Sequence, residues 1–303
     1  MFANKASRGV RISGRTLLAL VTTAMAVAAF GSASPALAVT HHPTGEYAPF
    51  ADCPLSNSAV AACLFAKTES GEFVVGKSTV PIKNAITLQG GLEQTGEKLT
   101  FVAAEDGNTL SKTAQPVPGG LAGFVECYKI TNFLERIACE LAFENGVTGV
   151  NATTELAAPA SSIEVNLSNL ISAEGIALSL PIKVHLENPF LGSSCYIGSN
   201  AKPIELPLTT GTTSPPAPNK PISGSPGEFE FKNGGNLIVI KNNSLVNNSY
   251  AAPEAEGCGG LLSFLIDPII NSKLGLPAAA GHNTAILKGT LQQASAAAVK
   301  ASE

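Results

Sequence analysis

One motif in this chain has the residue types and spacing of a phosphate-binding loop. Residues 71–78, GEFVVGKS, match the pattern G-x-x-x-x-G-K-[ST] at every fixed position. In such loops, backbone amides surround the phosphates at a helix N-terminus, while the lysine and serine serve the β/γ-phosphates and Mg²⁺. Here the variable residues are bulky and β-prone, and Thr79, Val80 and Pro81 disfavour a following helix. The motif therefore predicts a β-hairpin, and we expect no nucleotide cofactor.

The residues needed for nucleophilic hydrolysis are sparse. A serine or cysteine would need a histidine and an acid beside it, and the chain contains no G-x-S-x-G. His185 alternates with apolar neighbours, which predicts an outward-facing strand residue, and His282 lies in a turn-like sequence. We therefore predict no catalytic residue. A secreted hydrolase stays as an alternative, in which one of these histidines would share a pocket with a serine and an acid.

Metal ligands and paired carboxylates are not suggested by the spacing either. Glu254 and Glu256 flank Cys258 in a Pro-Gly loop and are expected to be solvated, as are the adjacent His41 and His42 near the start of the mature chain. No C-x-x-C occurs, and the aspartates are too few and scattered for calcium. The absence of tryptophan weakens a sugar-binding interpretation. No metal site is predicted.

The cysteines indicate an oxidising compartment. The chain has six: Cys53, Cys63, Cys127, Cys139, Cys195 and Cys258. An even count in an exported protein is typical of disulfides, although six cysteines allow 15 complete pairings. Pairing of nearest neighbours predicts the bonds Cys53–Cys63, Cys127–Cys139 and Cys195–Cys258.

The N-terminal residues have the three zones of a cleavable signal peptide. Four basic residues up to Arg15 precede an apolar run from Leu17 to Phe30, and Ala36-Leu37-Ala38 forms an A-x-A cleavage site. The run is too short to span a membrane, which needs about 20 residues. We predict a signal peptide over 1–38, cleavage before Val39, no transmembrane anchor after cleavage, and a secreted, extracellular or cell-envelope location.

The composition of the remaining chain excludes some partners. Without the four basic residues of the signal peptide, 15 Lys and Arg stand against 23 Asp and Glu, a net charge of −8, and Arg136 is the only arginine. A protein that binds the phosphate backbone needs a basic face, so nucleic acid is not expected as a partner. Over the full chain, 45% of the residues are hydrophobic and 14% are charged, which favours a folded protein.

Short β-prone runs separated by turn signals dominate the pattern. The clearest strand is 176–187, where the apolar residues Ile176, Leu178 and Leu180 occupy every second position and Ile182, Val184 and Leu186 continue the same face. Pro181, on the opposite face, suggests an edge strand or a bulge. Other strands are expected at 73–75, 85–88, 98–102, 163–167, 196–197, 204–208, 236–241, 244–250 and 284–291.

Three segments depart from this pattern. Residues 131–143 have apolar positions at helical spacing and predict one short amphipathic helix. Residues 209–227, rich in Thr, Ser, Pro and Gly, are interpreted as a long ordered loop, with an interdomain linker as the alternative. Residues 259–276 are apolar around Asp267-Pro268 and are expected to form a helix or loop packed in the core.

Together these features predict a mainly β, antiparallel, sandwich-like fold with one or two short helices and disulfides. A flexible leader is expected over 39–51 and one domain over 52–303, with a split near 209–227 as the alternative. The functional hypothesis is a secreted, non-catalytic binding or envelope-associated structural protein of unknown ligand. A secreted hydrolase and a carrier of an apolar ligand are the alternatives; a closed apolar cavity would favour the carrier.

Overall fold

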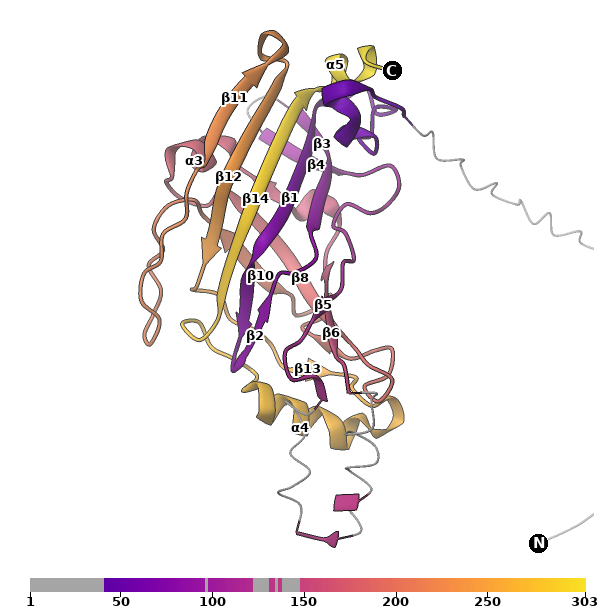
Figure 1. Ribbon diagram of the computed structural model, residues 1–303, viewed down its shortest axis with the longest axis vertical. Coiled ribbons are helices and arrows are strands. Elements are labelled where there is room, and N and C mark those ends of the chain that lie inside the picture. The colour runs from indigo at the N-terminus through magenta and orange to yellow at the C-terminus, as the bar shows by residue number, and fades with distance from the viewer. Residues whose placement is uncertain (1–40, 96–97, 122–130, 134–135, 138–147) are drawn as a thin grey trace, which may run out of the picture. The chain divides into compact units, whose positions relative to one another are not determined.

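Two antiparallel sheets build the structure, which is a computed structural model (Figure 1). It describes residues 41–95, 98–121, 131–133, 136–137 and 148–303. The predicted signal peptide, most of the predicted helix over 131–143 and the pair Cys127–Cys139 lie outside the described residues. Among the residues described, no helix is long and apolar enough to cross a membrane.

The first sheet has the strand order β11-β12-β14-β1-β3-β4, and β2 pairs with the second half of β1. Its strands are β1 (Val60–Val75), β2 (Ser78–Pro81), β3 (Ile86–Thr95), β4 (Lys98–Ala103), β11 (Glu228–Lys232), β12 (Leu237–Asn247) and β14 (Thr284–Ser295). The long strands β1, β12 and β14 form its centre, where each pairs over most of its length.

The second sheet has the order β13-β9-β8-β6-β5, with β7 and β10 also paired to β8. Its strands are β5 (Gln115–Pro116), β6 (Asn151–Leu156), β7 (Glu164–Val165), β8 (Leu178–Glu187), β9 (Tyr196–Ile197), β10 (Ile204–Leu208) and β13 (Ala255–Glu256). Every pairing in both sheets is antiparallel, so the predicted mainly β, sandwich-like fold is confirmed.

Short helices occupy the ends and connections. The α-helices that lie wholly within the described residues are α3 (Leu167–Ser172), α4 (Ser263–Leu274) and α5 (Ala296–Ala301). The 3₁₀ helices are η1 (Gly45–Phe50), η3 (Ala160–Ser162), η4 (Asn233–Gly235) and η5 (Gly260–Leu262). Helix α3 was not predicted: the Asn166 side chain accepts a hydrogen bond from the Asn169 amide, and this N-cap ends the expected strand 163–167 after Val165.

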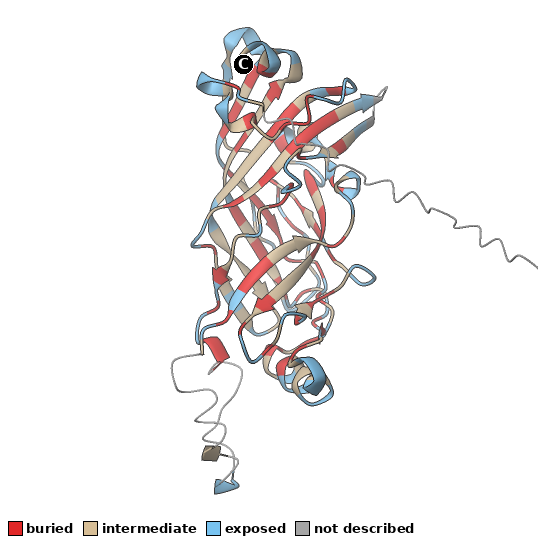
Figure 2. Ribbon diagram, turned by 90° about the vertical axis from the view of Figure 1, so that its right-hand side faces the viewer, coloured by how far each residue is buried: buried red, intermediate tan, exposed pale blue. Residues whose placement is uncertain are grey.

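Alternation along the strands places apolar side chains between the sheets. Buried residues recur along strands of both sheets (Figure 2), and one large cluster joins Leu64 and Leu92 of the first sheet to Leu180 and Leu206 of the second. A smaller cluster around Phe50, Leu237 and Val299 closes the end near α5. Each sheet is thus apolar on the face toward its partner.

Pro181 was expected to mark an edge or a bulge, but β8 has partners on both sides. On one side the ladder passes from β6, which reaches Ile182, to β7, which begins opposite Ser179. The Pro181 carbonyl accepts from the Ala157 amide on that same side. Because N–H and C=O of one strand residue point the same way, the missing N–H of Pro181 falls in the gap between β6 and β7, where no ladder bond is lost.

Two other expectations on the first sheet were incomplete. Segments 236–241 and 244–250 were expected to be two separate strands, but they belong largely to one strand, β12, with a register shift between Ile240 and Asn243. Its outer partner is β11, which was not predicted. Residues 209–227 form an ordered loop, attached to β12 by bridges of Thr209 to Val246 and of Ser225 to Ser244.

Disulfides fasten two parts of the chain. Cys53–Cys63 links the segment before β1 to that strand, and Cys195–Cys258 links the start of β9 to the turn before α4. Both agree with the pairing of nearest neighbours. The third predicted bond, Cys127–Cys139, stays a prediction.

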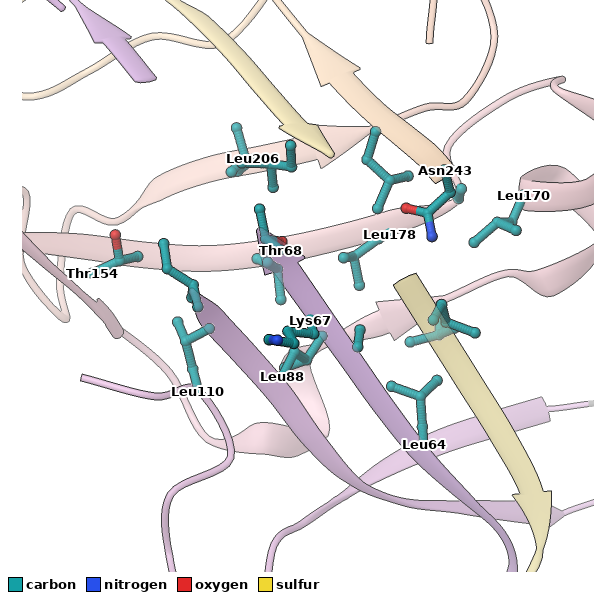
Figure 3. A pocket seen from close by; sticks show the side chains of 18 of the residues that line it. Leu64, Lys67, Thr68, Leu88, Leu110, Thr154, Leu170, Leu178, Leu206 and Asn243 are labelled. Carbon is teal, nitrogen blue, oxygen red and sulfur yellow. The ribbon is translucent and has the colours of Figure 1, made fainter. Parts of the chain in front are cut away.

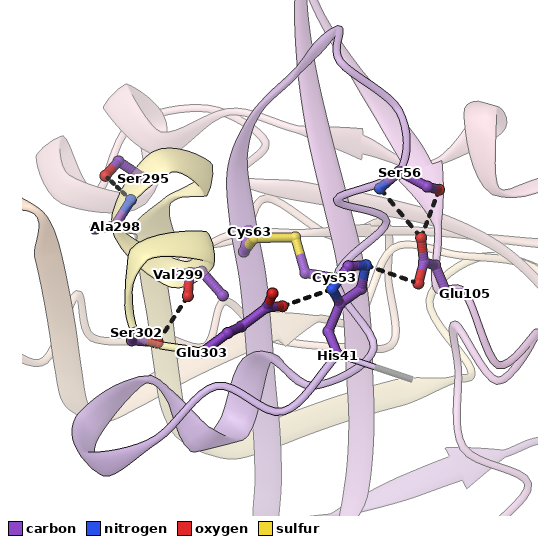
Figure 4. Close-up of a disulfide and its surroundings, with 10 residues drawn as sticks. All are labelled: His41, Cys53, Ser56, Cys63, Glu105, Ser295, Ala298, Val299, Ser302 and Glu303. Carbon is purple, nitrogen blue, oxygen red and sulfur yellow. Dashed lines mark hydrogen bonds and ion pairs between the residues drawn. A yellow bond between two sulfur atoms is a disulfide. The ribbon is translucent and has the colours of Figure 1, made fainter. Parts of the chain in front are cut away.

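The segment expected to be a flexible leader has defined contacts (Figure 4). His41 Nδ1 lies 2.5 Å from Glu303 Oε1, and His41 Nε2 lies 3.3 Å from Glu105 Oε2. Glu105 also accepts from the Ser56 hydroxyl, and Phe50 of η1 is buried. Residues 41–51 are therefore packed against the first sheet and the C-terminal residues.

Candidate functional site

Strand β8 supplies one wall of a hollow between the two sheets. Leu178, Leu180 and Ile182 point inward, and Val184 and Leu186 continue the same alternation. The outward residues of the same strand are polar at Ser179, Lys183, His185 and Glu187. Because of this alternation, β8 is apolar on its inward face and mainly polar on its outward face.

The first part of the hollow, which we call lobe 1, has a volume of about 70 Å³. It lies between Leu178 to Ile182 of β8 and residues of β1, β3, β12 and β14, and Leu170 of α3 contributes to its wall (Figure 3). Aliphatic side chains supply most of this wall, which is lined by Leu64, Ala66, Phe73, Ile86, Leu88, Leu110, Val165, Leu170, Ala177, Leu178, Leu180, Ile182, Leu206, Leu245, Leu287 and Leu291 together with Lys67, Thr68, Thr154, Asn243 and Thr290.

The second part, lobe 2, has a volume of about 50 Å³ and lies farther along β8. Val184 and Leu186 face it, Ala152 of β6 and Val75 of β1 add to its wall, and Leu274 of α4 also lines it. Four residues border both lobes: Phe73, Thr154, Ile182 and Leu206. The lobes therefore adjoin at the centre of the sandwich.

The arrangement of the lobes fits an elongated shape. The residues of β8 that face them run from Leu178 to Leu186, a stretch of strand of roughly 26 Å at about 3.3 Å per residue, so the two lobes follow one another along this strand. An extended hydrocarbon chain has this form. A compact polyaromatic ligand would need a wider space at one place.

Two polar side chains at the wall of lobe 2 are hydrogen-bonded within the protein. The buried Gln115 accepts from the Lys83 and Asn84 amides and donates to the Asn84 carbonyl. Tyr250, 4% exposed, donates its hydroxyl hydrogen to the Val74 carbonyl at 2.9 Å, and burial raises the pKa of this phenol, which stays neutral. Most of the other residues that line the lobes are apolar and offer little to water, so the lobes favour apolar guests.

The charge of Lys67, which also borders lobe 1, is directed away from it. The Lys67 ammonium lies 3.0 Å from Glu69 Oε1, and both side chains are about half exposed. The methylene stem and backbone of Lys67 are therefore what meets the lobe, and no ionised group is enclosed there.

One side of lobe 1 has a polar border created by two strand irregularities. The pairing of β1 with β14 shifts between Thr68 and Ser70, and that of β12 with β14 shifts between Ile240 and Asn243. Both shifts lie beside Gly289, where a Cβ would come 1.8 Å from the Lys67 carbonyl oxygen. The bulge carries Asn243, which borders lobe 1 and also a polar surface hollow of about 350 Å³.

A separate polar network lies on the outer face of the second sheet. The His185 ring stacks on Tyr196 at 4.4 Å, and His185 Nδ1 lies 3.4 Å from Glu187 Oε1 and 4.0 Å from Glu155 Oε1. Lys183 also approaches Glu155, at 3.7 Å. Burial, followed by the charge of Glu155, raises the pKa of Tyr196.

This network corrects the picture of His185 as a simply solvated histidine. It does face outward, but Tyr196 and the two glutamates cover it until its side chain is 16% exposed. Among the contacts of the described residues, His185 is joined to carboxylates and an aromatic ring, and to no serine or cysteine. A histidine with acids alone lacks the nucleophile that acyl transfer needs.

The phosphate-loop match is a β-hairpin, as predicted. Val75 of β1 pairs with Ser78 of β2 across the Gly76-Lys77 turn. The Lys77 amide donates to the Leu274 carbonyl at the end of α4, and the Gly76 amide donates to Asn283 Oδ1. The turn amides thus bind protein carbonyl groups, whereas in a phosphate loop they would surround an anion.

The remaining candidates lie apart from one another. His282 is exposed in a turn, Glu254 and Glu256 are exposed as expected, and Asp267 accepts from the backbone amides of Gly257 and Cys258. Within the described ranges no group of three or more His, Cys, Asp or Glu is placed to hold a metal ion.

Sequence reasoning did not identify the two lobes. The available signal was the spacing of small residues among large ones, since Ala66, Ala152 and Ala177 all line the lobes on strands or beside them. Comparison with known proteins adds no assignment: no family model, curated protein or solved structure matches the chain.

Proposed function

We propose that the mature chain is an exported protein that binds an elongated apolar ligand between its two sheets. The observation that carries this proposal is the pair of adjoining lobes, which are walled by aliphatic side chains and run along β8. The predicted signal peptide and the two disulfides of the described chain support export. The proposed function combines two of the hypotheses from the sequence: the protein binds without catalysis, and its ligand is apolar, as expected for a carrier.

Energetics support a ligand in this space. Protein interiors are normally packed as densely as organic crystals. A cavity costs about 24 cal/mol per Å³, so an empty lobe 1 of about 70 Å³ would cost about 1.7 kcal/mol. A chain of methylene groups gains about 0.8 kcal/mol for each group removed from water, which makes filling both lobes favourable.

The other hypotheses have less support. The hydrolase alternative would need a nucleophile near His185, and the described contacts of that residue are to Glu155, Glu187 and Tyr196. A binding module that acts only through its outer surface would have no use for an interior hollow between its sheets. The apolar lobes therefore favour ligand binding inside the sandwich.

The experiment is a titration of the mature protein with cis-parinaric acid, a fluorescent long-chain probe. The wild type should show saturable binding of one equivalent. Ala152→Leu fills lobe 2 and Ala177→Leu fills lobe 1, and each should weaken binding at least about tenfold because the methylene groups of the probe lose their space. The exposed Ala251→Leu is the matched control and should bind like the wild type.

Thermal unfolding of the same samples separates loss of the site from loss of the fold. A filling side chain adds apolar contacts, so the variants should melt near the wild type; the smaller Ala152→Val and Ala177→Val serve if leucine overpacks the lobe. Normal probe binding by folded, filled variants, or absence of binding to the wild type, would overturn the proposed function.

A further inference from the structure

The segment from η5 through α4 exposes an unusual run of large apolar side chains. The exposed residues, which we call the α4 face, are Leu261 (97% exposed), Leu262 (54%), Phe264 (70%), Leu265 (53%) and Ile269 (43%). The sequence predicted that 259–276 would be packed in the core, and this is wrong for the outer half of the helix. Exposed apolar groups gathered in one place mark a contact surface more often than scattered ones do.

The opposite side of the same helix is fixed to the protein. Ile270 and Leu274 are buried, and Leu274 lines lobe 2. Asp267 accepts from the amides of Gly257 and Cys258 at 3.1 and 2.7 Å, beside the Cys195–Cys258 disulfide. Helix α4 is thus apolar on both sides, with one side toward the ligand site and the other toward the surroundings, a pattern that surface helices in water avoid.

Charges around the helix favour an anionic surface at its end. The only acid of α4, Asp267, is turned toward backbone amides. Lys273 lies in the last turn, and the Lys77 ammonium lies 3.5 Å from the Ser272 carbonyl. Two lysines therefore lie at the C-terminal end of α4, in a mature chain whose net charge is −8, while the exposed Glu256 lies on the neighbouring β13. Apolar side chains next to lysines match the acyl and phosphate layers of a phospholipid surface.

We propose that the α4 face docks on a phospholipid bilayer and that lobe 2 exchanges its ligand with that bilayer. This inference rests on the proposed function, because an elongated apolar ligand has its natural source in a membrane. Leu274 and the α4 face are the two sides of one helix, so docking brings lobe 2 close to the acyl layer. The ligand then avoids a long path through water, where its transfer would be costly.

The test uses the mature protein and vesicles made of phosphatidylcholine alone or of an equal mixture of phosphatidylcholine and phosphatidylglycerol. The wild type should sediment with both, and more with the mixture. Phe264→Glu with Leu265→Glu should lower partitioning at least about tenfold, because two apolar side chains no longer enter the interface. These changes lie on the outer face, so binding of cis-parinaric acid in solution should stay unchanged.

A matched control variant exists on another part of the surface. Phe231 on β11 is also 70% exposed, and Figure 1 places β11 and α4 at opposite ends of the sandwich. Phe231→Glu should therefore sediment with vesicles like the wild type, whereas Phe264→Glu alone should already reduce sedimentation.

The outcomes distinguish the two proposals. Probe binding without vesicle binding would overturn docking and leave the proposed function in place. Vesicle binding without probe binding would overturn the proposed function and the ligand exchange that rests on it, and would leave the docking alone supported. Equal loss with Phe231→Glu would show unspecific adsorption and contradict the assignment of the α4 face. A wild-type dimer that Phe264→Glu dissociates in a sedimentation-velocity run would make this face a protein interface and also overturn docking.

Discussion

At the scale of single residues, the lysine of the phosphate-loop match stabilises a helix end. The Lys77 amide donates to the Leu274 carbonyl at 2.7 Å, and the Lys77 ammonium lies 3.5 Å from the Ser272 carbonyl. Cations near a helix C-terminus interact favourably with its dipole. The motif could be recognised as a hairpin from its β-prone residues, but this partner lies almost 200 positions away along the chain and has no local signal.

Asp52 gives a prediction about pH. Burial, then the charge of Asp106, raises the pKa of the Asp52 carboxyl above its ordinary value, although Gln89 Nε2 donates to it at 3.1 Å. A raised pKa means that the folded state binds the proton more readily than the unfolded chain does. The stability that Asp52 contributes is therefore present at acidic pH and is lost as the pH rises through the folded-state pKa.

Asp52→Asn removes this penalty. The free energy of unfolding at neutral pH should stay equal or rise by up to about 0.5 kcal/mol, because the carboxyl is only partly buried and solvent screens its charge interactions. The gain in stability should disappear at a pH below the ordinary pKa of an aspartate. Urea unfolding at neutral and acidic pH measures it; a gain that grows toward acidic pH would contradict the assigned direction.

At the scale of elements, the alternation of apolar residues predicted strands correctly, whereas residues that are typical of turns were misleading. Strand β8 was predicted nearly to its ends because large apolar residues occupy every second position from Leu178 to Leu186. Asn242-Asn243 was interpreted as the end of one strand and the approach to the next, yet Asn242 takes a φ of 54° inside β12 and produces a bulge. The same polar residues serve a turn and a bulge, and only the pairing with β14 decides between them.

Gly289 is a position where β14 lies very close to β1. A Cβ there would lie 1.8 Å from the Lys67 carbonyl oxygen, whereas one at Gly149 would meet nothing within 4 Å. Gly289→Ala should destabilise the protein by about 1–3 kcal/mol, because β14 must move away from β1. Gly149→Ala should stay within about 0.5 kcal/mol of the wild type. Chemical denaturation of both variants decides, and equal stabilities would show that the two strands separate at no cost.

At the scale of the whole molecule, the lobes arise from residues that no local pattern connects. Ile182 and Leu206 come from the second sheet and Phe73 from the first, and all three border both lobes. The sequence predicted strands with one apolar and one polar face, and therefore an apolar interior. Whether that interior closes completely depends on how the side chains of the two sheets meet, and that depends on long-range pairing.

Calorimetric titration with saturated fatty acids of increasing chain length tests the central claim most directly. A closed, elongated site predicts one equivalent bound, with a gain of about 0.8 kcal/mol per methylene that stops once the lobes are full. Ala152→Leu, which shortens the site at lobe 2, should move that plateau to shorter chains. Affinity that rises without a plateau, or a plateau that Ala152→Leu leaves in place, would contradict a ligand site between the sheets.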